Sequence, residues 1–216
     1  MRLKSLSLLY VFATAFLSSA VQAATDDVKN LLVVDSRVPQ AELFSHGLAE
    51  NTRLVRIDPS YDGLKQLAAA TKNLSELSSI QIVAHGADGS LLLGSQRLDA
   101  HPLARSTERL SAIGNSLGTT GDLLLFACDV AQSPLGEAFI EALADFTQAD
   151  VAASHGRIGN ASLDGNWKLE TATGPIDAEG LISARARSEF SSVLQSNVLE
   201  FAGNTIIQRD SFRPSS

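Results

Sequence analysis

Residues 121–134 read GDLLLFACDVAQSP, and this stretch decides the fold. Its unbroken apolar run ends in Cys128, and after Pro134 the apolar side chains are spaced three or four residues apart. A continuous apolar run is typical of a strand that is buried on both faces, as in parallel sheets. The spacing after Pro134 is typical of an amphipathic helix. The stretch therefore predicts a buried strand followed directly by a helix.

The same two patterns alternate along the chain. Strands are expected at 30–35, 53–58, 79–85, 122–128 and 150–154, with helices at 39–51, 61–74, 103–117 and 134–146 and a short hairpin at 89–99. Alternation of strands and helices favours a parallel sheet with helices on both faces. We therefore predict an α/β domain with three layers, α/β/α, in a flavodoxin-like arrangement around a mostly parallel central sheet.

Residues 1–23 have the pattern of a secretory signal peptide: a basic start, a short apolar stretch and small residues that end at Ala23. The apolar stretch is shorter than the ~20 residues of a membrane span, and an uncleaved anchor is the alternative. We predict an α/β domain over 24–180, a C-terminal extension over 181–216, and no integral membrane segment after signal cleavage. The protein is expected in the periplasm or outside the cell of a Gram-negative bacterium.

Composition excludes several functions. The net charge of −7 argues against electrostatic binding to nucleic acid or to anionic lipid. A chain with a single cysteine cannot form an internal disulfide, so its core must stabilise it. No His, Cys or carboxylate residues have the spacing of metal ligands, so we predict no metal and no cofactor. The sequence leaves the oligomeric state open.

Two reactive side chains are expected at the ends of neighbouring strands. His85 ends the strand over 79–85, and Cys128 ends the strand over 122–128. Sites in open parallel sheets lie beyond the carboxyl ends of the strands, and consecutive strands are usually neighbours. A histidine base can take the proton of a thiol nucleophile. The backbone N–H groups of Gly86 and Cys128 can then form an oxyanion hole.

An apolar strand that ends in HG, followed by an apolar strand that ends in AC, resembles the caspase-like cysteine peptidases, which include caspases, gingipains, clostripain and separase. The segments LLVVDSRVP, IQIVAHGADGSLLLG, GDLLLFACDVA and GNWKLE more closely resemble the DUF4347 domain, over about residues 30–178. That domain is common near the N-terminus of very large secreted bacterial adhesins and calcium-repeat proteins. The resemblance implies a caspase-like fold, His85 as general base, Cys128 as nucleophile, and a polypeptide or the chain itself as substrate.

Two further residues are candidates for substrate binding. The resemblance implies that Asp129 lines a pocket for a basic substrate side chain; the alternatives are a solvated acid or a helix N-cap. His155 follows the strand over 150–154 at the same sheet edge. It is expected either to line the substrate cleft or to be an exposed loop residue.

Three functions remain open from the sequence. The first is a cysteine peptidase-like domain that cleaves other polypeptides or its own chain. The second is a non-catalytic secreted or cell-surface module associated with adhesins. The third is a serine hydrolase, because GNSLG at 114–118 matches the G-x-S-x-G motif and would make Ser116 the nucleophile. That motif requires a strand before the serine and a helix after it, whereas Ser116 follows an expected helix and precedes an expected strand.

Overall fold

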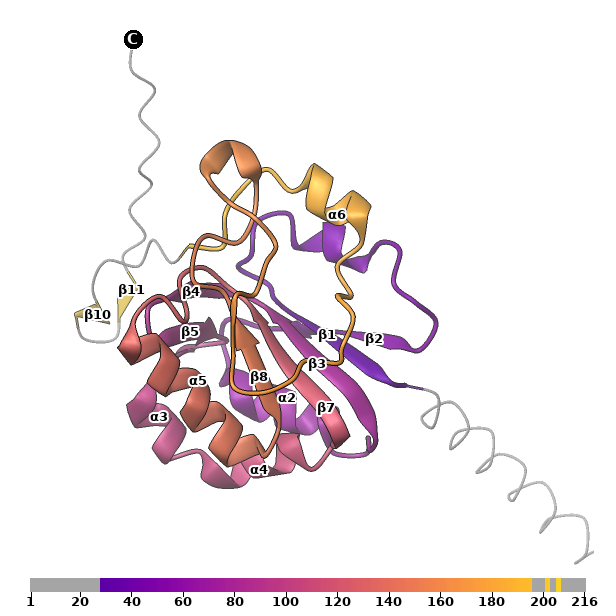
Figure 1. Cartoon of the computed structure of the whole chain (residues 1–216), viewed down its shortest axis with the longest axis vertical. Helices are drawn as coiled ribbons and strands as arrows, with labels where there is room; N and C mark the ends of the chain where they lie inside the picture. Colours follow the sequence, from indigo (N-terminus) through magenta and orange to yellow (C-terminus); the bar gives the residue numbers. More distant parts are fainter. Residues whose placement is uncertain (1–27, 196–200, 203–204, 207–216) are drawn as a thin grey trace, which may run out of the picture.

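A computed structural model describes residues 28–195, 201–202 and 205–206. These residues form an α/β domain in which helices flank a six-stranded, mostly parallel sheet (Figure 1). The predicted signal peptide, 1–23, lies outside the described residues. Within the described part of the chain, no helix has both the length and the apolar character needed to cross a membrane.

The central sheet has the strand order β2-β1-β3-β7-β8-β9. Its strands are β1 (Asn30–Asp35), β2 (Thr52–Ile57), β3 (Leu77–Val83), β7 (Leu117–Phe126), β8 (Asp150–Ala153) and β9 (Thr171–Ala172). All neighbouring pairs are parallel except β8 and β9. This order confirms the predicted fold class. The strand order reverses between β1 and β3, and such a reversal opens a crevice at the carboxyl ends of the strands.

A second, antiparallel sheet lies beside this crevice. It consists of β4 (His85–Ala87), β5 (Ser90–Leu93) and β6 (Gln96–Leu98). The hairpin expected at 89–99 is confirmed as β5 and β6. The strand expected over 79–85 ends at Val83, so His85 begins β4 rather than ending β3.

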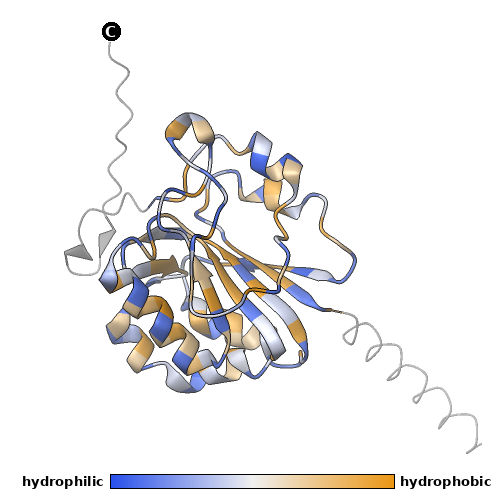
Figure 2. Cartoon of the chain, viewed as in Figure 1, coloured by the Kyte–Doolittle hydropathy of each residue, from blue (hydrophilic) through white to orange (hydrophobic). Residues whose placement is uncertain are grey.

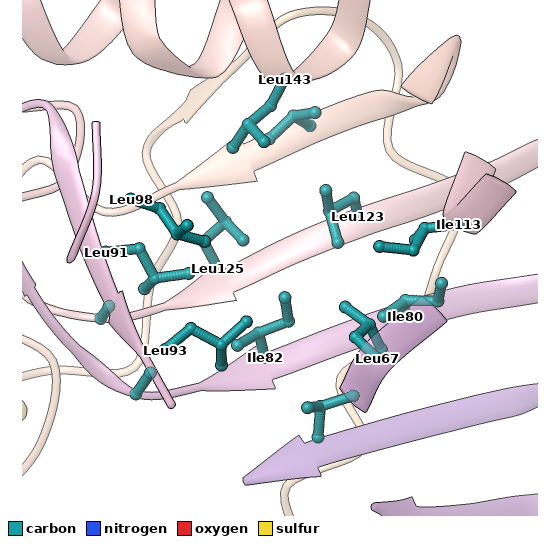
Figure 3. Packing of buried hydrophobic residues seen from close by; sticks show 14 of the residues in the cluster. Leu67, Ile80, Ile82, Leu91, Leu93, Leu98, Ile113, Leu123, Leu125 and Leu143 are labelled. Atoms are coloured by element: carbon teal, nitrogen blue, oxygen red, sulfur yellow. The ribbon is translucent and has the colours of Figure 1, made fainter. Parts of the chain in front are cut away.

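Four helices cover one face of the central sheet (Figure 1). They are α2 (Gly63–Thr71), α3 (Ala100–Ala104), α4 (Thr107–Gly114) and α5 (Pro134–Thr147). The single helix expected at 103–117 is therefore two helices, α3 and α4, separated at residues 105–106. Apolar side chains of the strands meet those of the helices: Figure 3 shows Ile113 of α4 beside Leu123 of β7, and Leu67 of α2 beside Ile80 of β3. The hydropathy colours of Figure 2 show apolar residues concentrated along the strands.

The opposite face is covered by shorter elements, η1 (Ala41–Ser45) and α6 (Ala184–Glu189), whereas the residues of η2 (Ala161–Leu163) are exposed. The helix expected at 39–51 was therefore too long. The turn begins at Gln40 in the left-handed region, without a side-chain cap, and the left-handed Gly47 lies two residues past its end. Phe44 packs edge-on against Trp167, with 6.1 Å between ring centroids, and both rings contact Phe190.

Residues 177–194 pack across this second face and are held there by hydrogen bonds and apolar contacts. The buried Gln81 amide donates to the Glu179 carbonyl at 2.6 Å and accepts from the Leu181 N–H at 2.9 Å. The Asp122 carboxylate accepts two further N–H groups from residues 177 and 178. Four side chains at intervals of four residues are buried in the core: Ile182, Ala186, Phe190 and Leu194. The first part of the predicted extension, 181–216, is thus packed against the domain, and β10 (Phe201–Ala202) pairs with β11 (Thr205–Ile206) beyond it.

Candidate active site

Cys128 lies two residues beyond the end of β7, and its side chain is fully buried. The Cys128 thiol donates a hydrogen bond to the Ile158 carbonyl at 3.5 Å and accepts one from the Ile158 N–H at 3.2 Å. Burial raises the pKa of this thiol to about 12, although the Ile158 backbone acts in the opposite direction. At neutral pH the sulfur is therefore protonated and held by the loop that follows β8.

His85 lies at the start of β4, where β3 passes into the small sheet. Its Nε2 atom is 3.4 Å from the Arg37 carbonyl, and its buried Nδ1 atom has no hydrogen-bond partner among the described residues. Burial lowers the pKa of the ring, while the backbone of Arg37, the charge of Asp35 and the backbone of Gln195 oppose that change. The ring is thus neutral at pH 7 and able to accept a proton.

Asp35 organises the loop that holds His85. Its carboxylate, only 1 % exposed, accepts the Arg37 N–H at 3.0 Å and the Gly94 N–H at 2.7 Å. It also pairs with the Arg37 guanidinium at 3.1 Å. These contacts fix the Arg37 backbone, whose carbonyl faces the His85 ring. Asp35 therefore acts on His85 through Arg37 and through its own negative charge.

The N–H groups of Gly86 and Cys128 converge on one oxygen atom. Both donate to the carbonyl of Leu194, at 3.0 Å from Gly86 and 3.3 Å from Cys128. The approach is possible because Gly86 has no side chain: a Cβ atom there would lie 2.7 Å from the Cys128 carbonyl oxygen. The two predicted oxyanion-hole donors thus lie together, and a carbonyl of the same chain occupies them.

The segment around Leu194 pairs with the loop after β8 as an added strand would. The Leu194 N–H donates to the Ile158 carbonyl at 2.8 Å, and the Asn160 N–H donates to the Ser192 carbonyl at 2.8 Å. An antiparallel bridge joins Val193 to Gly159. The Leu194 N–H and the Cys128 thiol therefore meet at the same Ile158 carbonyl.

The structure brings His85, Gly86 and Cys128 to one edge of the sheet, but it does not join the two reactive side chains. Among the described residues, no hydrogen bond connects the His85 ring to the Cys128 thiol. The thiol bonds to Ile158 and the ring lies against Arg37. A catalytic proton transfer would need a rotation of the thiol away from Ile158.

The comparison with protein families identifies one family that covers this site. The family described as "Domain of unknown function (DUF4347)" matches residues 31–194. The chain belongs to the DUF4347 family. No curated protein matches the chain. Among the solved structures that match, "Crystal structure of a small-chain dehydrogenase" is 13% identical in sequence. The alignment covers 55% of this chain and 77% of that chain, and its TM-score of 0.30 is too low to support any conclusion about function.

Asp129 of this DUF4347 domain lies in the left-handed region, with φ of 60°, and its N–H donates to the Gly156 carbonyl. Burial raises the pKa of its carboxyl, and the nearby Arg157 opposes that rise. The N-cap of α5 is Ser133, whose hydroxyl accepts the Leu135 N–H. The N-cap alternative for Asp129 is therefore wrong.

His155 and Ser116 lie apart from the converging N–H groups. The exposed His155 follows β8, and its Nδ1 atom is 3.3 Å from the Ala131 carbonyl. Ser116 is buried behind the end of α4, where its hydroxyl donates to the Ile113 carbonyl at 2.6 Å. A helix precedes this serine and β7 follows it, which is the reverse of the order that a nucleophile elbow requires.

Sequence reasoning missed Leu194, Ile158 and Asp35, the residues that complete the site of this DUF4347 domain. The four-residue spacing of Ile182, Ala186, Phe190 and Leu194 was a usable signal for a buried segment. Nothing in the sequence indicated the pairing with Ile158. Within the described ranges, no group of three or more His, Cys, Asp or Glu residues is placed to hold a metal ion.

The raised thiol pKa predicts slow alkylation of the native protein. At pH 8 the thiolate fraction of a thiol with a pKa of about 12 is roughly a thousandfold below that of a thiol with a pKa of 9.0. Iodoacetamide should therefore label Cys128 at least about a hundredfold faster in urea than in buffer. Intact mass spectrometry over time measures both rates, and equal rates would show that the thiol is not buried as described.

Proposed function

We propose that this DUF4347 domain is an exported cysteine peptidase-like domain that acts on polypeptides, including its own chain. The convergence of the Gly86 and Cys128 N–H groups on the Leu194 carbonyl carries this proposal. Oxyanion holes are built from such paired donors, which lie about 2.7–3.1 Å from the oxygen that becomes charged. The same two N–H groups would stabilise the tetrahedral intermediate that forms when a thiol attacks a peptide carbonyl.

The proton transfer would start from a pair of neutral groups. The pKa of the Cys128 thiol is raised by burial and the pKa of the His85 ring is lowered by burial, so neither is charged near pH 7. His85 would then accept the thiol proton as the sulfur attacks, as a general base does. It would return that proton to the leaving amine. Asp35 has the positioning role in this mechanism, because it fixes the Arg37 carbonyl beside the ring.

Substrate selection follows from the residues around the cleft. The fully buried Leu194 side chain packs in an apolar cluster with Ile158 and Phe190, which supports an apolar residue before the scissile bond. Asp129, which follows Cys128, and His155, which follows β8, remain proposed substrate-binding residues at the carboxyl edge of the sheet. We further propose that the protein reaches the periplasm or the exterior of a Gram-negative cell after removal of residues 1–23.

The proposed function is tested with a full-length variant in which the cleft is opened. Leu194→Ser removes the apolar anchor of the covering segment and should admit a Val-Leu acyloxymethyl ketone, a peptide reagent that alkylates activated thiols. We expect one adduct on Cys128, located by peptide mass spectrometry. Adding His85→Ala should slow its formation by about a hundredfold or more, because the thiol then lacks its base.

Two controls decide the result. Cys128→Ala in the Leu194→Ser background must give no adduct. His101→Ala in that background should leave the rate within a fewfold, because the exposed His101 lies in α3 and belongs to no part of the proposed site. Labelling that is as fast without His85 as with it would refute the dyad.

One observation favours a second candidate, a non-catalytic adhesin-associated module. The thiol is fully buried, bonds to Ile158, and makes no hydrogen bond to the described His85 ring. In that case residues 192–195 serve only as a closing strand. The Leu194→Ser variant distinguishes the two, since a purely structural thiol gains accessibility in this variant but no dependence on His85.

A further inference from the structure

Residues 192–195 pair with the loop after β8 and with Gly86 as a bound peptide substrate would. The Leu194 carbonyl accepts from both oxyanion-hole donors, and the Leu194 N–H donates to Ile158. Two residues earlier, the Ser192 carbonyl accepts from Asn160, which continues the antiparallel pairing. Peptides that bind by strand addition use such main-chain hydrogen bonds for affinity and a side-chain pocket for specificity.

The groups needed for chemistry lie on either side of one peptide bond. The Leu194 side chain is fully buried in the apolar cluster that also contains Cys128. Gln195, the next residue, forms a parallel bridge with Gly86, and its backbone is close enough to favour the protonated form of His85. The Leu194 backbone is thus close to the Cys128 thiol, and the Gln195 backbone is close to the His85 ring.

We infer that the Leu194–Gln195 peptide bond is a self-cleavage site of this protein. The inference rests on the proposed function and specifies its substrate as one bond of the same chain. Cleavage there would separate residues 195–216 from the folded domain. The domain would then keep Leu194 as its C-terminal residue, seated in its own cleft as a product.

The chemistry balances with water as the only co-reactant. The Cys128 sulfur forms a bond to the Leu194 carbonyl carbon while its proton passes to His85. The bond between that carbon and the Gln195 nitrogen then breaks, and the nitrogen takes the proton from His85, which leaves a Leu194 thioester on Cys128. Water hydrolyses the thioester with His85 again as base. The products are a Leu194 carboxylate, a free thiol and a peptide that begins at Gln195.

Intact mass spectrometry of the purified full-length protein tests the inference. During incubation at pH 7–8, the wild-type chain should lose residues 195–216 and give a new C-terminus at Leu194 and a new N-terminus at Gln195. Cys128→Ala should remain whole. Gln195→Pro should also remain whole, because the proline ring is bonded to the leaving nitrogen and would crowd the approach of His85 to it.

The outcomes separate the two proposals. An intact wild-type chain whose Leu194→Ser variant still reacts with the ketone in a His85-dependent manner would overturn the self-cleavage site and keep the peptidase. Cleavage at another bond that depends on Cys128 would likewise overturn the Leu194–Gln195 site and keep the peptidase. An intact wild-type chain together with His85-independent labelling would overturn both. Cleavage after Leu194 that persists in Cys128→Ala would also refute the inference.

Discussion

Gly86→Ala is expected to lower the free energy of unfolding by about 3 kcal/mol, the upper part of the usual range for overpacking. A Cβ atom at this position would lie 2.7 Å from the Cys128 carbonyl oxygen and 2.8 Å from both the Ala127 Cβ and a Val130 methyl. One of these contacts is with backbone at the end of a central strand, so rotation of a side chain cannot relieve it. The small sheet must move away from β7.

That movement should also remove the Gly86 N–H from the Leu194 oxygen. Thermal unfolding measures the stability loss, at about 2–4 °C of Tm for each kcal/mol in a domain of this size. Gly156→Ala is the matched control, because a Cβ atom there would have nothing within 4 Å. Equal melting temperatures for the two variants would show that β4 does not pack against the end of β7 as described.

Asp35→Ala is expected to cost about 3–5 kcal/mol of stability, the usual effect of removing one partner from a buried ion pair. Its carboxylate is 1 % exposed and accepts N–H groups from both Arg37 and Gly94. The truncation leaves both N–H donors without this acceptor and leaves the guanidinium with the Gly94 carbonyl but no carboxylate. Asp35→Asn retains the shape and one acceptor oxygen, so it should lose less. Urea denaturation of the three proteins measures the differences.

Glu189→Gln is the control for the Asp35 variants. The pair of Arg185 and Glu189 has a short distance of 2.8 Å, but both side chains are well exposed, so its removal should change stability by less than about 1 kcal/mol. An equally small loss for Asp35→Ala would contradict the buried anchoring role. In the Leu194→Ser background, Asp35→Asn should lower the apparent pKa of the labelling reaction, because the charge of Asp35 favours protonated His85.

The central strands were predictable because burial on both faces leaves a simple signature. LLVV in β1 and LLLF in β7 are continuous apolar runs, and each became an inner strand. Their parallel order places residues 85 and 128 at one edge, as the sequence indicated. The helix expected around Phe44 was wrong in length, because the left-handed Gln40 and Gly47 permit only one short turn.

The contacts within the site were not predictable from local patterns. The partner of the Cys128 thiol is the backbone of Ile158, and any residue type can offer backbone groups. The acceptor of the Gly86 and Cys128 N–H groups is likewise a carbonyl, and it comes from a distant part of the chain. Periodicity reports which side chains are buried, whereas it does not report which loop pairs with which strand. The Asp35 anchor was missed for a related reason, since its partner Gly94 is 59 residues away.

Residues 177–194, which cross the second sheet face, have a consequence for the order in which the folded domain can form. Ser191 bonds to Gln40 across 151 residues, and Leu181 bonds to Gln81 across 100. A chain is made from its N-terminus at about 5–20 residues per second, so the last layer of the core arrives after everything beneath it. A polypeptide truncated before Phe190 would leave Phe44 and Trp167 without one of their aromatic partners. Chains that stop before Phe190 should therefore aggregate or be degraded, and only a chain made as far as Leu194 can place that carbonyl against the Gly86 and Cys128 N–H groups.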